Sequence, residues 1–228
     1  MKTTAIILAG GKGKRMGSDI PKQYLEIGNK PVLYYSVKAF EESCVDEIII
    51  VAAGTDIPMV KEDIVERYGF SKVKNVVAGG IERYDSVYQG LLAADGADYV
   101  LIHDGARPCV TADIIERSIR AAKKYKACAA GMPVKDTIKT VDKNGFALNT
   151  PDRRMLWAIQ TPQTFSYELI MEAHNARIKA RDKDVTDDAM LVERYTKTPV
   201  YIFEGSYDNI KITTGDDMEI AALKLISR

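Results

Sequence analysis

The most constraining feature of the sequence is the alternation of short apolar runs with segments of helical periodicity. Apolar runs of this length, rich in β-branched residues and bounded by polar or glycine-containing turns, are typical of buried strands. The predicted strands are Thr3–Ala9, Glu47–Ala53, Val73–Ala78, Tyr99–Ile102 and Ala127–Met132. Alternating strands and helices predict a Rossmann-like α/β fold, in which helices cover both faces of a mostly parallel sheet. Ligands of such sheets lie at the carboxyl ends of the strands.

Four residues are expected to mark the ends of helices. Asn29 and Asp56, each followed two residues later by proline, are predicted N-caps of the first two helices. Gly69 is expected to end the second of these helices, because glycine readily adopts the left-handed backbone conformation found at helix ends. Thr111 is expected to cap a helix over Ala112–Lys124.

The α/β pattern is interrupted at residues 134–152, "VKDTIKTVDKNGFALNTPD". Polar alternation around Asn144-Gly145 predicts a β-hairpin there. Such a hairpin is either a decoration at the sheet edge or an arm that reaches a partner chain, and the spacing alone favours decoration. The pattern then resumes with strand Leu156–Ile159, helix Tyr167–Ala180, strand Val200–Glu204 and a helix from Asp216.

Composition limits the classes of function. The 228 residues are consistent with a single domain, and the equal counts of 32 basic and 32 acidic residues give no basic field for nucleic acid. No stretch is long and apolar enough to predict a membrane span. Two histidines exclude a His-rich metal centre, and three cysteines without a CxxC spacing favour a reduced, cytoplasmic protein. Any anion site must therefore be local.

A glycine-rich loop follows the first predicted strand, in "ILAGGKGKRMGSDIPKQ" at residues 7–23. Gly13-Lys14 is followed by Arg15, which excludes a Walker motif, and Met16 replaces the last glycine of a dinucleotide fingerprint. Glycine lets a phosphate approach backbone N–H groups, while Arg15 and Lys22 supply positive charge. An anion site at the ligand edge is favoured over a solvated surface loop.

Two other loops have a similar character. In "AGGIERYDSV", residues 78–87, Gly79-Gly80 brings backbone close to a ligand and Ser86 falls in the first turn of a helix. In "SYDNIKITT", residues 206–214, Lys211 follows a late strand. Taken alone, the first is nearly as consistent with a simple strand–helix turn, and the second with an exposed lysine.

The loop "LIHDGARP", residues 101–108, carries the candidate metal ligand. An aspartate that leaves a parallel strand beside bound phosphates is suited to hold Mg²⁺, which gives this role to Asp104. A structural, hydrogen-bonded histidine is the favoured interpretation of His103, rather than a base. Arg107 is either the ion-pair partner of Asp104 or a ligand of a second anion. No Ser-His-Asp order is present, so the site is built for phosphate chemistry through positioning and charge.

The segments "LAGGKGKRM…PKQ", "VAGGIERYDSV", "HDGARP", "PVKDTIK", "LWAIQTPQTF", "TDDA" and "DNIKITT" occur in order from residue 5 to about residue 220. Together they resemble the 2-C-methyl-D-erythritol 4-phosphate cytidylyltransferases of the non-mevalonate isoprenoid pathway. The resemblance implies an Mg²⁺-dependent reaction in which CTP and a polyol phosphate, methylerythritol phosphate, give a CDP-alcohol and pyrophosphate. It also implies a homodimer in which the hairpin, at about residues 134–153, embraces the second subunit, which replaces the preference for a decoration.

The resemblance assigns roles to residues of this chain. The implied catalytic residues are Arg15, Lys22 and Lys211, and the implied metal ligand is Asp104. The nucleotide-binding positions it implies are Ala9, Gly10, Gly11, Gly80, Ser86 and Gly105. The polyol-phosphate positions it implies are Arg107, Thr137, Arg153, Thr161 and Asp208, with Thr137 and Arg153 acting across the dimer.

Two alternatives remain at this stage. A ribitol-5-phosphate cytidylyltransferase is the first, because residues 8–11 read Leu-Ala-Gly-Gly where the family often has Pro-Ala-Ala-Gly, and Ile81 replaces a frequent acidic residue. The "PVKDTIK" and "LWAIQTPQ" segments favour methylerythritol phosphate. A nucleotide-binding regulatory module without turnover is the second alternative. The joint presence of Lys22, Asp104 and Lys211 argues against it, since binding alone would not require all three.

Overall fold

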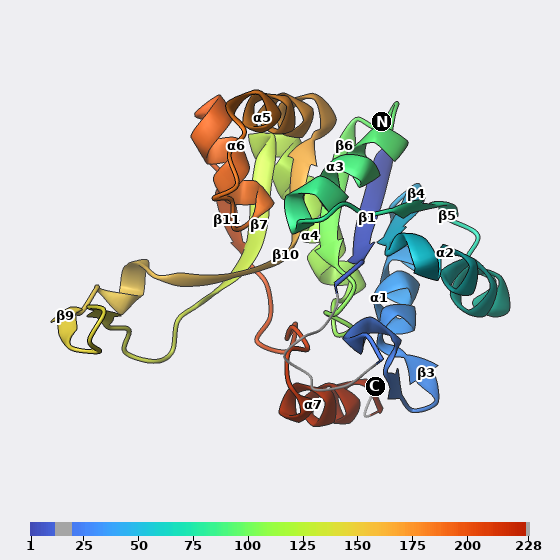
Figure 1. Cartoon of the computed structure of the whole chain (residues 1–228), viewed down its shortest axis with the longest axis horizontal. Coiled ribbons are helices and arrows are strands. Elements are labelled where there is room, and N and C mark those ends of the chain that lie inside the picture. Colours follow the sequence, from blue (N-terminus) through green and yellow to red (C-terminus); the bar gives the residue numbers. More distant parts are fainter. Residues whose placement is uncertain (12–19, 227–228) are drawn as a thin grey trace.

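The structure is a computed structural model that describes residues 1–11 and 20–226. Its centre is a seven-stranded sheet in the order β11-β7-β10-β6-β1-β4-β5 (Figure 1). Its strands are β1 (Thr3–Ala9), β4 (Glu47–Ala52), β5 (Val73–Ala78), β6 (Tyr99–Asp104), β7 (Ala127–Pro133), β10 (Trp157–Ser166) and β11 (Tyr201–Glu204). Strand β10 runs antiparallel to both of its neighbours, β6 and β7, whereas the other pairs are parallel. The expected α/β fold with a mostly parallel sheet is confirmed.

Helices pack on both faces of this sheet because successive side chains of each strand point to opposite faces. Along β1, Ala5 and Ile7 belong to one buried apolar cluster and Ile6 belongs to the other. The helices on the first face are α1 (Val32–Glu41), α2 (Ile57–Met59), the π-helix η4 (Val60–Glu66) and α4 (Ala112–Tyr125). Those on the second face are α3 (Arg83–Ala93), α5 (Tyr167–Ala180) and α6 (Asp188–Thr196).

The predicted helix ends are only partly correct. Gly69 has φ +66° after the second helical segment, and the Thr111 hydroxyl accepts a hydrogen bond from the Ile114 N–H, so both of these predictions are confirmed. The prediction for Asn29 is wrong. This residue has φ +63° and lies in the turn between the short strands β2 (Glu26–Ile27) and β3 (Lys30–Pro31). The N-cap of α1 is Pro31, and α1 therefore begins without a side-chain cap.

Asp56 occupies the N-cap position of α2, but its side chain makes no capping hydrogen bond. Asp56 instead ends a short 3₁₀ turn, η3 (Gly54–Asp56), and its carboxylate accepts a hydrogen bond from the hydroxyl of Thr55. Asp56 is therefore at the predicted N-cap position, but the prediction that its side chain caps the helix is wrong.

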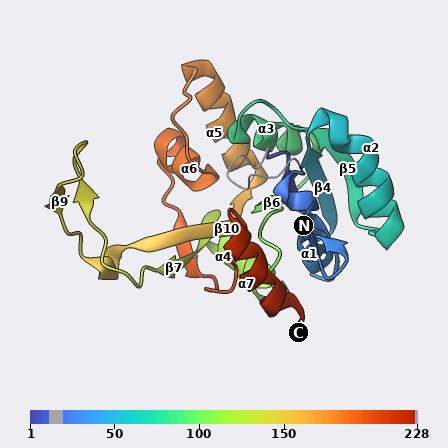
Figure 2. The same cartoon turned by 60° about the horizontal axis from the view of Figure 1, so that its bottom comes forward.

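The hairpin predicted at Asn144-Gly145 is present and extends away from the sheet (Figures 1 and 2). It consists of β8 (Thr140–Val141) and β9 (Ala147–Asn149), followed by the 3₁₀ turn η5 (Arg153–Met155). Within its turn Gly145 has φ +87°. The exposed fractions of Phe146, Leu148 and Met155 are 71%, 69% and 80%. We refer to residues 134–156 as the arm.

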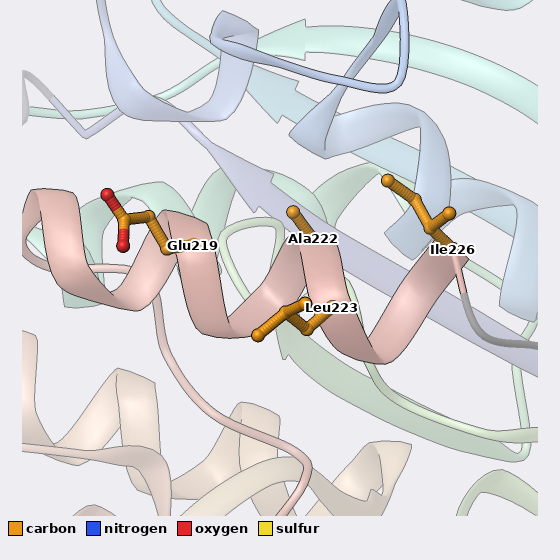
Figure 3. Close-up of a pocket in the computed structure, with 4 residues that line it drawn as sticks. All are labelled: Glu219, Ala222, Leu223 and Ile226. Carbon is orange, nitrogen blue, oxygen red and sulfur yellow. The ribbon is translucent and has the colours of Figure 1, made fainter.

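The last helix, α7 (Gly215–Ile226), lies at the carboxyl edge of the sheet (Figure 1). Its Ala221 packs with Ile27, Val32, Cys109 and Ile212 in a third buried apolar cluster. The same edge carries the 3₁₀ turn η2 (Lys22–Tyr24). A shallow hollow of α7, lined by Glu219, Ala222, Leu223 and Ile226 (Figure 3), contains none of the predicted site residues. In the described part of the chain, no helix has the length and apolar character needed to cross a membrane.

Candidate active site

The loops predicted to form the site leave the sheet at a common edge. Strands β5, β4, β1 and β6 are mutually parallel neighbours, so their carboxyl ends lie side by side. Gly10 and Gly11 follow β1, Gly80 follows β5, and Asp104 is the last residue of β6. The fold therefore brings together segments that are far apart in the sequence, at the position where parallel sheets bind ligands.

Asp104 is the centre of a cluster of charged side chains. Its Oδ2 lies 2.9 Å from Lys211 Nζ and 3.6 Å from Arg107 Nε, and its Oδ1 lies 3.5 Å from Arg83 Nε. Arg83 also forms an ion pair with the buried Asp188, at 2.8 Å between Nη2 and Oδ2. One nearly buried carboxylate is thus surrounded by three cations from three separate loops.

The three cations determine the protonation state of Asp104. Burial by itself raises the pKa of this carboxyl, but the charges of Arg83, Lys211 and Arg107 outweigh burial and hold the pKa well below its usual range. Asp104 is therefore ionised at neutral pH. A buried carboxylate without such partners would destabilise the folded protein by roughly several kcal/mol.

His103, the neighbour of Asp104, is a structural residue. Its Nε2 lies 3.2 Å from the Arg107 carbonyl oxygen, and its Nδ1 lies 3.0 Å from the Thr161 hydroxyl. The same hydroxyl accepts the backbone N–H of Asp104 at 3.1 Å. These contacts fit a neutral imidazole that donates from Nε2 and accepts at Nδ1. His103 is fully buried, and burial lowers its pKa to about 4, so the imidazole is neutral at pH 7.

The late loop, residues 206–214, is bound to the loop that follows β6. The Ile212 N–H donates to the Ala106 carbonyl at 2.9 Å, and Arg107 Nη1 donates to the Asn209 carbonyl at 2.9 Å. Asn209 Nδ2 donates in turn to the Thr161 carbonyl at 2.8 Å. This ladder of contacts places Lys211 beside Asp104.

Lys22 is attached to the same loop. Its Nζ donates to the carbonyl oxygen of Ile212 at 2.6 Å. The next residue, Gln23, is buried and donates from Nε2 to the carbonyl of Ala9 at 2.6 Å, which anchors η2 against the end of β1. Lys22 is therefore bonded to the residue that follows Lys211, although the two predicted catalytic lysines lie near opposite ends of the sequence.

The segment that carries Lys211 is held at its other end by Asp217. A single oxygen of this carboxylate, Oδ2, accepts from the N–H and hydroxyl groups of Thr213 and Thr214, at 2.7 to 3.0 Å. Burial raises the pKa of Asp217, but these hydrogen bonds exceed that effect and the pKa is lowered overall. The first turn of α7 thus fixes the backbone immediately after Lys211.

Glycine is required where the backbone of two loops is close to other atoms. A Cβ at position 80 would lie 2.3 Å from Asp85 Cβ, and one at position 105 would lie 2.8 Å from the Leu8 carbonyl oxygen. Ser86 Oγ accepts the N–H of Gly80 at 3.1 Å, so this serine orders the glycine loop. The N–H of Gly105 donates to Leu8 at 2.9 Å. The assignment of Gly80, Ser86 and Gly105 to cytosine binding stays a prediction.

Some predicted site residues do not join the cluster within this chain. Arg15 lies outside the described residues. Thr137 and Arg153 are exposed on the arm, where Arg153 Nη1 donates to the Lys135 carbonyl at 3.1 Å. Asp208 belongs to the late loop, but its carboxylate pairs with Lys224 of α7 at 2.7 Å.

Two residues of the cluster were not identified from the sequence. Arg83 stands within the quoted loop "AGGIERYDSV", and Asp188 within "TDDA", but neither was singled out. Helix α6, which begins at Asp188, was also missed. A useful signal was the position of Arg83, because an arginine in the first turn of a helix opposes the helix dipole and requires a compensating anion.

The donor set limits which metal the site can hold. Among residues 1–11 and 20–226, no group of three or more His, Cys, Asp or Glu side chains is arranged to bind a metal ion. The single carboxylate of Asp104 is suited to Mg²⁺, because this ion is commonly held by one or two carboxylates together with substrate phosphates and water. The residues fit a metal that enters with a nucleotide, and they do not fit a metal held by protein ligands alone.

Comparison with known proteins finds relatives that match over almost the whole chain. The model of a family described as 2-C-methyl-D-erythritol 4-phosphate cytidylyltransferase matches residues 3–227. A protein of that name from Alkaliphilus oremlandii is 51% identical over 222 residues, which cover 96% of this chain and 93% of the relative. Another, from Lachnospira eligens, is 51% identical over 224 residues, which cover 97% of this chain and 98% of the relative.

Two solved structures are similar to this chain in overall fold. The crystal structure of 4-diphosphocytidyl-2C-methyl-D-erythritol synthase from Anaerococcus prevotii has a TM-score of 0.86 and 33% identity, covering 100% of this chain and 99% of that chain. The 2-C-methyl-D-erythritol 4-phosphate cytidylyltransferase of Thermus thermophilus has a TM-score of 0.81 and 27% identity, covering 99% of this chain and 100% of that chain.

Proposed function

This chain belongs to the 2-C-methyl-D-erythritol 4-phosphate cytidylyltransferase family, and we propose that the cluster around Asp104 is its reaction centre. Its activity is cytidylyl transfer in the non-mevalonate pathway of isoprenoid biosynthesis. CMP passes from CTP to 2-C-methyl-D-erythritol 4-phosphate and pyrophosphate leaves. The matching family is that of the methylerythritol phosphate enzymes, which decides against a ribitol-phosphate enzyme and against a module without turnover.

One observation carries the assignment of the centre. The ionised carboxylate of Asp104 lies within 3.6 Å of Lys211 and Arg107, at the edge where the glycine loops end. A carboxylate is the preferred protein ligand of Mg²⁺, and the surrounding cations are suited to phosphate oxygens. The combination is suited to a magnesium nucleotide and an attacking phosphate, and it offers little to an uncharged substrate.

The attacking group needs no general base. A phosphate monoester has its second pKa near 6 and is largely dianionic at neutral pH. The difficulty is electrostatic, because two unit charges 4 Å apart repel by about 4 kcal/mol at an effective dielectric constant near 20. Lys22, Lys211 and Arg107 reduce this repulsion, and His103, enclosed and neutral, is not needed as a proton acceptor.

We assign Arg15 and Lys22 to the triphosphate, with Lys22 at the α-phosphate, where charge develops during transfer, and Lys211 to the polyol phosphate. Preorganised cations at such a position act mainly on the transition state. Lys22 is held at its place by the Ile212 carbonyl, and Lys211 by Asp104. Mg²⁺ bound through Asp104 would supply charge neutralisation for the phosphates and the departing pyrophosphate.

The arm supplies the rest of the polyol-phosphate site in this proposal. The chain forms one nucleotidyltransferase domain with an arm at about residues 134–153, and two chains form a homodimer in which each arm crosses to the other subunit. The exposed apolar side chains of Phe146, Leu148 and Met155 support this, since an isolated two-stranded hairpin is marginally stable and needs a surface to pack against. Arg153 and Thr137 then contact the phosphate bound by the partner.

Nucleotide selection is proposed to follow from the backbone near Gly80 and Gly105, with Ser86 in support. The carbonyl and amino groups of cytosine are matched by backbone groups, and purines exceed the available space. Among the described residues no disulfide joins the cysteines, which supports a reaction in the cytoplasm.

A pyrophosphate-release assay tests the proposal. CTP, UTP, ATP and GTP are each combined with methylerythritol phosphate, ribitol phosphate and a hexose 1-phosphate. We expect the fastest release with CTP and methylerythritol phosphate in Mg²⁺, and loss of activity in EDTA. Faster turnover with a purine nucleotide or with ribitol phosphate would refute the assignment.

A further inference from the structure

Arg83 connects two carboxylates that belong to different parts of the fold. It is the first residue of α3, directly after the loop that contains Gly79 and Gly80. Its Nε lies 3.5 Å from Asp104 Oδ1 at the end of β6, and its Nη2 lies 2.8 Å from Asp188 Oδ2 at the start of α6. A single guanidinium thus bridges the candidate metal ligand and a buried acid outside the catalytic loops.

The two oxygens of Asp104 have different partners. Oδ2 faces both Lys211 and Arg107, whereas Arg83 is the cation beside Oδ1 in the described part of the chain. The backbone of Asp104 is fixed separately, through its N–H and the Thr161 hydroxyl. Without Arg83, the remaining cations would attract the carboxylate from one side only. Arg83 therefore determines how the carboxylate is turned.

Asp188 gives Arg83 a rigid anchor. It is 1% exposed, and its N–H donates to Gln163 Oε1 at 3.1 Å. The same oxygen accepts the N–H of Ala189, so β10 holds the first turn of α6 in place. A planar guanidinium presents several N–H groups in a fixed fork and can serve both carboxylates together, which a lysine ammonium at this position cannot reproduce.

We propose that Arg83, anchored by Asp188, is a positioning residue that orients the Asp104 carboxylate for the Mg²⁺ that accompanies CTP. The proposal rests on the proposed role of Asp104 as the metal ligand. Removing an outer partner of a metal-binding group typically costs 10- to 100-fold in metal affinity or activity, and we expect about this effect here. Arg83 acts through Asp104 and is not assigned a contact with the nucleotide.

Equilibrium binding of CTP separates this role from others, because no turnover occurs without the polyol phosphate. The CTP dissociation constant is measured by calorimetry in Mg²⁺ and again in EDTA. The constant in EDTA divided by the constant in Mg²⁺ gives the contribution of the metal to CTP binding. For Arg83→Met we expect this ratio to fall by about 10- to 100-fold, with the affinity in EDTA unchanged. An equal loss of CTP affinity in both conditions would make Arg83 a nucleotide ligand, and unchanged affinity in both conditions would exclude a role in CTP binding; either result leaves the ratio unchanged and overturns the proposal.

Arg177→Met is the matched control. Arg177 of α5 is buried and forms an ion pair with Asp85 of α3 at 3.0 Å, but among the described residues it forms no ion pair with Asp104. We expect this variant to lose stability and to keep the metal contribution to CTP binding. A fall in that contribution as large as in Arg83→Met would show a general effect of loosening α3 and would contradict the positioning role. Arg83→Lys retains the charge for folding and is expected to lose the metal contribution as well.

Two further variants distinguish the parts of the proposal. Asp188→Asn should lower the metal contribution, and combining it with Arg83→Met should give no additional loss, since both changes interrupt the same connection. Full additivity would separate Asp188 from Arg83 and overturn the anchoring. Asp104→Asn tests the underlying assignment: a metal contribution equal to that of the native protein would reject Asp104 as ligand, whatever Arg83 does.

Discussion

Lys211 Nζ lies 2.9 Å from Asp104 Oδ2, which joins the last loop of the chain to the end of a central strand. The contact is supported on both sides, because Ile212 bonds to the backbone of Ala106 and also accepts Lys22. The proposed reaction centre is therefore complete only when residues from the beginning, middle and end of the sequence are folded together. Substitution of either lysine, Lys22 or Lys211, should affect turnover more than nucleotide binding.

Lys22→Ala should lower kcat by about 10²- to 10³-fold with a much smaller change in the KM for CTP. Its positive charge stabilises the negative charge that develops on the phosphates during transfer, and this interaction is stronger in the transition state than in the ground state. Steady-state kinetics with saturating methylerythritol phosphate measure both constants. The exposed Lys61→Ala serves as control. A rise in KM with kcat unchanged would identify Lys22 as a ground-state binding residue.

Asp217→Ala should reduce both kcat and stability, whereas Asp216→Ala should reduce stability less and leave kcat unchanged. The two acids are neighbours in the first turn of α7 and interact similarly with the helix dipole, but Asp217 alone receives the hydrogen bonds of Thr213 and Thr214. Loss of such a capping carboxylate costs about 0.5–2 kcal/mol. It also releases the backbone that positions Lys211.

Urea unfolding and steady-state kinetics measure the two effects of this pair. Equal losses in both variants would attribute the effect to helix charge. A destabilised Asp217→Ala enzyme with normal kcat would show that the cap is structural only.

Much of the fold follows from the sequence because burial on both sheet faces requires continuous apolar strands. Strands Thr3–Ala9 and Val73–Ala78 coincide with the prediction, and the helix Tyr167–Ala180 does as well. Strand β10 was expected to be much shorter than its ten residues. Beyond Ile159 it carries Thr161 and Gln163, buried polar residues that do not resemble a core strand and whose side chains are hydrogen-bonded through tertiary contacts.

The candidate site was predictable where the chemistry is carried by one residue at the end of a strand, as for Asp104. It was not predictable where partners come from distant elements. The pairing of Arg83 with Asp188 joins residues 105 positions apart, and no local pattern identifies it. Asn29 was misassigned for a related reason, because asparagine is common both at helix N-caps and at turn positions with positive φ.

His174→Phe should leave the protein at least as stable at pH 7.5 and make it relatively more stable in acid. His174 is fully buried and stacks on Tyr88, and both of its ring nitrogens lack hydrogen-bond partners among the described residues. Burial lowers its pKa to about 3. The unfolded chain, with an ordinary pKa near 6.5, then binds a proton that the folded protein does not bind.

Stability contributed by neutral His174 is present above about pH 6.5 and is lost as the pH falls from there toward 3, by up to about 1.4 kcal/mol per pH unit. Urea unfolding of both proteins at pH 7.5, 6 and 5 measures the difference between their free energies of unfolding. This difference should grow in favour of the variant as the pH falls. A constant difference would show that folding does not lower the pKa of His174.

We propose that each reaction centre combines the Asp104 cluster of one chain with the arm of another. Lys22 belongs to the cluster and Arg153 to the arm, so Lys22→Ala and Arg153→Ala should each inactivate a homodimer. In a mixed dimer with the arm acting in trans, one site carries both changes and the other carries neither.

Subunit mixing measures this directly. The two variants are purified with different tags, unfolded and refolded together, and the heterodimer is isolated by tandem affinity before pyrophosphate release is assayed. Activity of the heterodimer near half that of the native dimer is the predicted result. A purified heterodimer as inactive as its parents would place arm and cluster of the same chain in one site and contradict the claim.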